Sequence, residues 1–293
     1  MHTHDDYYKK GEHGALIGIL VNLGLFFFKG FAGIFGASHA MVADALHTAS
    51  DLVTSIGVLI GFRIAKQPAD AEHPYGHGRA ESIMAKLVAL ALIMMGLKVA
   101  YDAVRVIALQ DFTVPRQIAL WAAIVSILVK EALFQYTHHI GKKISSTSLM
   151  ADAWHHRTDA ISSVAALIGI GGARLGMTIL DPIAALVVAI LVVKIGFSTF
   201  HKAYDELMDA SLPKDVMGQI HGLTHEIKGV KRIKNIKARK LGIDVFIDMT
   251  IDVEPRMSVE EAHKITDQIR RNILHKLTST KDILIHVEPY RGS

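Results

Sequence analysis

Six long apolar stretches limit what this chain can fold into. They run over about residues 14–36, 39–65, 80–108, 117–139, 148–173 and 179–202, and each is long enough, or nearly so, to cross a bilayer. Charged and polar side chains interrupt them, which predicts a helical bundle with a wet or protein-lined interior. Composition agrees, because 51% of the residues are hydrophobic and only 20% are charged. We therefore expect a polytopic α-helical membrane protein with six transmembrane helices.

Basic residues are unevenly distributed among the connections between these stretches. The connection after the second stretch holds Arg63, Lys66 and Arg79, and the one after the fourth holds Lys142 and Lys143. By the positive-inside rule we expect these connections and both termini to be cytoplasmic. We expect a multi-pass protein of the inner or plasma membrane. The same flanks explain the net charge of +4. No basic run interleaved with aromatics indicates a nucleic-acid partner.

The chain becomes polar after about residue 205, where a second type of structure is expected. Residues 211–293 contain alternating patterns typical of strands and two amphipathic patterns typical of helices. Ser258 and Glu261 form a capping box at the start of the second helix. The expected elements are a helix over 214–227, strands over 230–238 and 245–253, a helix over 258–277 and a strand over 282–287. This order predicts a small α+β domain with helices covering one face of its sheet. The expected divisions are a cytoplasmic tail over 1–12, a transmembrane domain over 13–205 and a cytoplasmic domain over 206–293.

The pattern His-x-x-x-Asp occurs twice, in the second and fifth apolar stretches. His47 with Asp51 forms one pair and His155 with Asp159 the other. A spacing of four places each pair on one helix face, so two facing helices would offer a tetrahedral set for Zn²⁺. His156 would point to another face. The chain has no cysteine, so any metal ligands must be nitrogen and oxygen atoms. A hydrogen bond between helices is the alternative for one pair, but the repeated order and spacing favour an ion site.

Two further groups of residues could bind metal. The segment PADAEHPYGHGRAES places Asp70, His73 and His77 around a turn, although it could also be a solvated polar loop. Near the C-terminus, His286 and Glu288 lie two apart in a strand and His263 lies on the preceding helix. These three could form part of a surface metal site or could be bystanders.

Together these features resemble a bacterial cation diffusion facilitator, over about residues 12–290. The matching features are six spans, HxxxD in the second and fifth, QPADAEHPYGHGRAES after the second and IHVEP near the end. The resemblance implies a homodimeric metal/proton antiporter that exports divalent cations and carries a ferredoxin-like αββαβ cytoplasmic domain. It assigns transport to His47, Asp51, His155 and Asp159, a set that prefers zinc among Zn²⁺, Cd²⁺, Fe²⁺ and Mn²⁺.

The resemblance also covers the remaining candidate residues. The family's loop site falls on Asp70, His73 and His77. Only part of its C-terminal two-metal pattern is present: His263, His286 and Glu288 match, while Lys234 and Thr250 stand where some relatives have histidines. A single or weak regulatory zinc site is therefore expected there. Arg79 and Asp209 match the family's charge interlock between the loop and the cytoplasmic domain.

Two other functions are compatible with buried metal ligands. An intramembrane zinc metalloenzyme would need an open zinc position and a general base, and no HExxH motif occurs. A membrane-anchored metal sensor would leave the two intramembrane pairs unexplained. No GxxxxGK[ST] motif indicates ATP use. We therefore expect a secondary transporter and not an enzyme.

Overall fold

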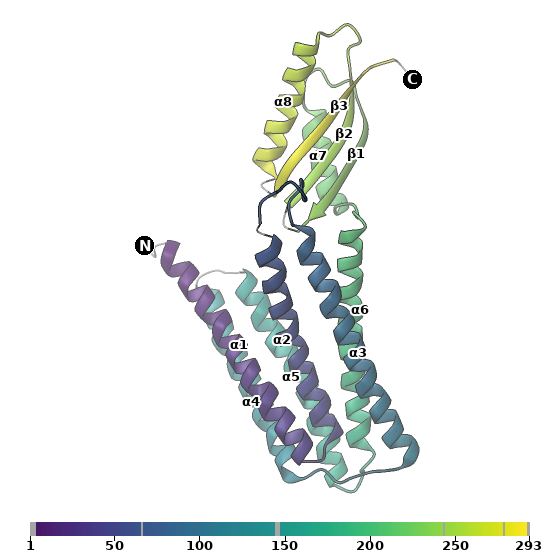
Figure 1. Ribbon diagram of the computed structural model, residues 1–293. Helices are drawn as coiled ribbons and strands as arrows, with labels where there is room; N and C mark the ends of the chain where they lie inside the picture. The colour runs from purple at the N-terminus through teal and green to yellow at the C-terminus, as the bar shows by residue number, and fades with distance from the viewer. Residues whose placement is uncertain (1–3, 66, 144–146, 243, 278, 292–293) are drawn as a thin grey trace. The chain divides into compact units, whose positions relative to one another are not determined.

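Helices dominate the part of the chain that the computed structural model describes, which is residues 4–65, 67–143, 147–242, 244–277 and 279–291. The six long helices are α1 (His4–Phe35), α2 (His39–Ala65), α3 (Arg79–Leu109), α4 (Gln117–Lys143), α5 (Thr147–Arg174) and α6 (Leu180–Leu207). They are followed by α7 (Lys214–His225), β1 (Arg232–Leu241), β2 (Asp244–Val253), α8 (Val259–Lys276) and β3 (Thr280–Pro289). Figure 1 shows these elements. The order matches the sequence prediction, although α1 begins well before residue 14.

The chain divides into two compact units. The helical unit comprises Met1–Gly57 and Leu87–Phe200, and the α+β unit comprises Val58–Lys86 and His201–Ser293. Helices α2, α3 and α6 contribute residues to both units. The α+β unit therefore includes the loop after α2 in addition to the C-terminal residues.

The helical unit has apolar side chains outside and charged side chains inside. Phe27 and Ile168 are each 65% exposed, whereas Lys29 and Asp44 have no exposed surface and Lys130 has 1%. In the described residues, four helices are long and apolar enough to cross a membrane, and these are α1, α3, α4 and α6. Helices α2 and α5 carry the two polar pairs. This distribution is that of an integral membrane bundle with a functional interior.

Small residues bring helices of this unit into close contact. A Cβ atom on Gly96 of α3 would lie 2.7 Å from Cγ2 of Val193, and one on Gly196 of α6 would lie 2.8 Å from Cγ1 of Ile93. Since real Cβ contacts are longer, each glycine accommodates a side chain from the facing helix. Such reciprocal packing is typical of helices in lipid, where close van der Waals contact drives association.

A fully buried ion pair connects three of the helices. Nζ of Lys29 on α1 lies 2.8 Å from Oδ2 of Asp44 on α2. Lys29 also donates to the hydroxyls of Thr48 and Ser163, each at 3.0 Å. Asp44 accepts hydrogen bonds from Ser162 at 2.9 Å and from Ser163 at 2.8 Å, both on α5. Every charge in this cluster is thus compensated, as burial at zero exposure requires.

The α+β unit contains a three-stranded sheet in the order β1-β2-β3. Strand β1 pairs antiparallel with β2, and β2 pairs parallel with β3. Alternate β2 side chains enter a core that also contains Ile269 and Ile273 of α8 and Ile220 of α7. Ser258 and Glu261 form the predicted capping box at the start of α8. The predicted ferredoxin-like α+β fold is therefore confirmed (Figure 1).

Removing the Lys29 ammonium should destabilise the helical unit. In Lys29→Met the Asp44 carboxylate would remain buried without its cation, and we expect a loss of about 3–5 kcal/mol in the free energy of unfolding. Adding Asp44→Asn should restore much of this loss, because a neutral amide needs no counter-charge. Denaturant titration of each purified variant in detergent measures both changes in the free energy of unfolding.

The matched control is Lys264→Met in α8, outside the membrane-spanning helices. Lys264 is 67% exposed and pairs with Glu260 within the same helix. An exposed pair of this kind contributes about 0–1 kcal/mol. Equal losses for the two lysine variants would contradict the importance of the buried pair.

Candidate metal centre

Three of the four predicted transport ligands come together inside the helical unit. His47 and Asp51 of α2 and Asp159 of α5 offer donor atoms that all lie within 4.8 Å of one another. Nε2 of His47 is 3.8 Å from Oδ1 of Asp159. His155, the fourth predicted ligand, belongs to α5, but its side chain lies outside the described residues. The i, i+4 spacing thus places His47 and Asp51 on one face of α2, and the packing of α5 brings Asp159 to the same place.

A carboxylate of α6 fixes the start of α2. Asp181 is 1% exposed and accepts hydrogen bonds from the Ser38 hydroxyl at 2.6 Å and the His39 amide at 2.7 Å. The Ala40 amide adds a longer bond of 3.4 Å. The first amides of a helix have no partner within the helix, and a carboxylate there also complements the helix dipole. Asp181 therefore holds the N-terminal end of the helix that carries His47 and Asp51.

The structure adds Lys130 of α4 to this centre, a residue to which sequence reasoning gave no role. Its Nζ lies 2.8 Å from Oδ2 of Asp159 and 3.9 Å from Oδ2 of Asp51. Lys130 is 1% exposed and Asp159 is 4% exposed. The sequence signal was a lysine within an apolar stretch, but periodicity alone does not show which neighbouring helix such a residue faces. The centre is therefore built from three helices, not two.

The imidazole of His47 keeps one coordinating atom uncommitted. Among the described residues, its Nδ1 is buried and has no hydrogen-bond partner. Unsatisfied polar atoms are costly at this depth and indicate a place for a further group. An imidazole and two carboxylates form a donor set suited to divalent metal ions. His156 lies elsewhere, with Nε2 3.3 Å from where a Cβ on Gly18 of α1 would be, in agreement with its exclusion from the ligand set.

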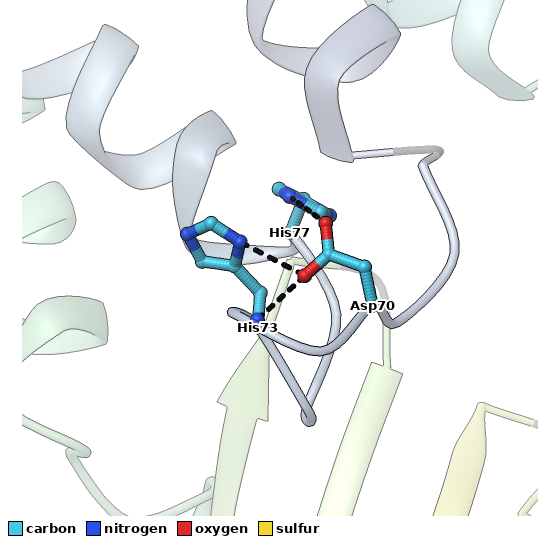
Figure 2. A group of neighbouring side chains, drawn as sticks. All are labelled: Asp70, His73 and His77. Atoms are coloured by element: carbon cyan, nitrogen blue, oxygen red, sulfur yellow. Dashed lines mark hydrogen bonds and ion pairs between the residues drawn. The ribbon is translucent and has the colours of Figure 1, made fainter.

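The loop between α2 and α3 forms a second cluster of possible ligands (Figure 2). Asp70 lies 3.2 Å from Nδ1 of His73 and 3.5 Å from Nε2 of His77. The backbone curls around the carboxylate, since Asp70 also accepts from the amides of Glu72 at 3.0 Å and His73 at 2.6 Å. Gly76 has φ of +83°, which favours glycine at this turn. The sequence spacing therefore produces one compact cluster of three donor side chains.

Hydrogen bonding holds the Asp70 carboxyl in its charged form. The largest cause is the His73 backbone amide, which lowers the pKa of Asp70 below its ordinary range, and the His73 side chain adds to the effect. The side chains of Asp70 and His73 are about half exposed, while His77 is more buried. This carboxylate is accessible to solvent cations at neutral pH.

The expected Arg79 and Asp209 pair is in contact. Nη2 of Arg79 lies 2.8 Å from Oδ1 of Asp209, and Nη1 donates to the Leu207 carbonyl at 2.9 Å. The guanidinium thus also satisfies the last carbonyl of α6. A cavity of about 620 Å³ adjoins this pair and is lined in part by His73, His77 and Arg239.

The structure does not bring the three C-terminal candidates together within one chain. His263 lies on the exposed side of α8 beside Asp267. Ile283 of β3 is buried in the core that the sheet shares with α8. Ile285 packs against the same core. Strand alternation therefore directs His286 and Glu288 to the opposite sheet face.

On that opposite face, a lysine contacts the predicted acidic ligand. Nζ of Lys234 lies 2.6 Å from Oε2 of Glu288, and His286 lies 3.7 Å from Oε1 of the same residue. The described residues of one chain contain three-donor groups at the transport centre and the loop, and none that includes His263. A metal site made of His263, His286 and Glu288 within a single chain is not supported by this geometry.

A membrane bundle with a buried group of possible metal ligands, in one chain with an α+β unit, is typical of membrane proteins that handle cations. Residues 15–208 match the cation efflux transmembrane domain and residues 212–290 match the cation efflux protein cytoplasmic domain. The chain belongs to the cation efflux family, whose members transport divalent metals. The family resemblance found in the sequence is therefore confirmed.

Named relatives match over most of this chain. Metal tolerance protein C1 of Arabidopsis thaliana is 36% identical over 98% of this chain, which spans 64% of that protein's length. The uncharacterized transporter YdbO of Bacillus subtilis is 36% identical over 96% of both chains. The manganese efflux system protein MneP of Bacillus subtilis is 33% identical, over 94% of this chain and 95% of that protein.

The depressed pKa of Asp70 predicts how the loop responds to acid. Since the pKa of Asp70 is lower in the folded loop than in an unfolded chain, its hydrogen bonds stabilise the loop above the ordinary aspartate value of about 3.9. That stabilisation is lost as pH falls through the depressed value. Carboxyl carbon shifts of aspartate-labelled protein measure the titration, and the Asp70→Asn spectrum assigns the signal. A midpoint at or above the ordinary aspartate value would contradict the hydrogen-bonded geometry.

Proposed function

We propose that this protein exports divalent metal ions from the cytoplasm in exchange for protons. The observation that supports this most directly is the buried cluster of His47, Asp51 and Asp159 in a bundle whose exterior is apolar. Ionisable side chains at membrane depth are costly and usually mark an ion pathway. His155, one helical turn before Asp159, would complete a four-ligand site.

Zinc is the metal we assign to this site. Two imidazoles with two carboxylates suit a borderline ion such as Zn²⁺, whereas an all-oxygen site would favour Mn²⁺ or Mg²⁺. Relatives named for manganese efflux make Mn²⁺ the main competitor. Cd²⁺ and Fe²⁺ complete the set of candidate substrates.

Transport then follows an alternating-access cycle. With the site open to the cytoplasm, neutral imidazoles and ionised carboxylates bind the metal. With the site open to the other side, a histidine takes up a proton and metal affinity falls, since the ligand form of histidine is neutral. The protonated site returns, so the proton gradient drives export without ATP.

The remaining predicted features support this cycle from the cytoplasmic side. We assign both termini to the cytoplasm and the protein to the cell membrane, with the tail over 1–12 and the boundary near 205 as expected from the sequence. The loop cluster of Asp70, His73 and His77 would collect metal ions, and the Arg79–Asp209 pair would tie that loop to the cytoplasmic domain.

We further propose a homodimer joined through this domain, with a weak regulatory zinc site.

Substitution of single transport ligands tests the proposal. Asp51→Ala and Asp159→Ala should each abolish zinc-driven proton flux in reconstituted vesicles, because each removes one ligand and one negative charge from the site. His47→Asp should raise transport of Fe²⁺ and Mn²⁺ relative to Zn²⁺, since a site richer in oxygen suits harder ions better. A pH-sensitive dye with each metal in turn measures these fluxes.

Asp244→Ala is the matched control for carboxylate loss. Asp244 begins β2, outside the membrane-spanning helices, and its partner Lys281 is 64% exposed. We expect flux within about twofold of wild type, since solvent-exposed pairs contribute little. Full residual flux in Asp51→Ala, or equal loss in the control, would overturn the site assignment.

A further inference from the structure

Lys130 occupies the position of a competing cation in the candidate transport site. Its ammonium lies 2.8 Å from the Asp159 carboxylate and 3.9 Å from that of Asp51. Both carboxylates belong to the same three-donor cluster as His47. With 1% of its surface exposed, Lys130 has almost no access to solvent in this arrangement.

Lys29 and Lys130 are both buried in the bundle but differ in what surrounds them. Lys29 has one carboxylate at 2.8 Å and two hydroxyl acceptors, so its charge is compensated by Asp44 and its neighbours. Lys130 instead lies between the carboxylates of Asp159 and Asp51, which share a three-donor group with His47. Lys29 thus belongs to a structural ion pair, and Lys130 contacts the donor atoms of the candidate metal site.

A divalent ion and the ammonium cannot share this cluster in its present geometry. The metal would need the same carboxylate oxygens that the ammonium contacts, and two cations a few ångströms apart repel strongly in a medium of low dielectric constant. Lysine is also a flexible point charge on four carbons, so it can withdraw without a change in the helix backbone. The ammonium must therefore leave Asp159 before the metal is fully coordinated.

We propose that Lys130 is a tethered cation that competes with the substrate metal and sets how tightly the site holds it. This inference rests on the proposed function, because it concerns the same site. When metal is absent, the charged side chain offsets part of the negative charge of the two carboxylates and stabilises the site. When metal binds, the side chain is displaced, and its return assists metal release.

Zinc binding and zinc transport should therefore change in opposite directions in Lys130→Met. Removing the competing cation should lower the zinc dissociation constant of the purified protein by about tenfold or more, because one opposing charge is removed from the site. The maximal zinc flux in vesicles should fall severalfold, since release becomes slower. Isothermal titration calorimetry at one fixed pH measures the zinc affinity. The same titration of Asp159→Asn gives the binding of zinc to all other sites, which is subtracted.

Two further variants separate competition from a structural role. Lys130→Arg keeps the charge and can bind a carboxylate through two hydrogen bonds, so zinc affinity should equal or fall below that of wild type. Ser126→Ala removes a buried hydroxyl of α4 that donates to the Ala122 carbonyl, and it should leave affinity and flux unchanged. Size-exclusion profiles in detergent confirm that each variant is folded.

The possible outcomes distinguish this inference from the proposed function. If the wild-type protein neither binds nor transports zinc or manganese, the proposed function fails. If wild type binds and transports the metal but Lys130→Met binds with equal or lower affinity, Lys130 only positions the ligands and the inference fails. Should Lys130→Met not fold, tighter zinc binding by Lys130→Arg than by wild type would overturn the inference instead.

Discussion

Charge compensation inside an apolar-faced bundle is the constraint on which the helical unit depends. Asp44 on α2 is balanced by Lys29 on α1, and Asp159 on α5 contacts Lys130 on α4. Each ion pair joins two consecutive helices, because a carboxylate buried at this depth requires a partner. The Ser162 and Ser163 hydroxyls of α5 connect the Lys29–Asp44 pair to a third helix. The polar residues of the interior thus determine which helices pack together, while small residues such as Gly96 allow them to approach. Structure and cation chemistry share the same set of contacts.

The sequence predicted the elements of this fold well because each left a strong periodic or compositional signal. Helix limits of α2 to α6 and the αββαβ order followed from apolar length, alternation and the capping box at Ser258. The His47 and Asp51 spacing correctly placed both side chains beside Asp159. Periodicity describes only the faces of one helix, however, so it could not assign Lys130 or Lys29 to their partners on other helices.

The C-terminal candidates show the same limitation in a strand. Alternation in ILIHVEP separates Ile285 from His286, and the core position of Ile285 shows which side faces the helices. His286 therefore points away from α8, where His263 lies. Glu288 is already paired with Lys234. A lysine next to a possible acidic ligand thus occurs in both units, beside Asp159 and beside Glu288.

The cap that Asp181 provides at the start of α2 has a mechanical consequence. Because its carboxylate binds the Ser38 hydroxyl and the His39 amide, that end of α2 moves with the beginning of α6 as long as these bonds persist. If α2 tilts, it therefore rotates about its N-terminal end, and the displacement of a residue grows with its distance from that end. His47 lies about 12 Å and Asp51 about 18 Å from that pivot at 1.5 Å per residue. A tilt of about 10° would displace Asp51 by about 3 Å, more than the length of a metal–oxygen bond. A small change in the angle of α2, with its N-terminal end held by Asp181, is thus sufficient to bring the ligands together or to separate them.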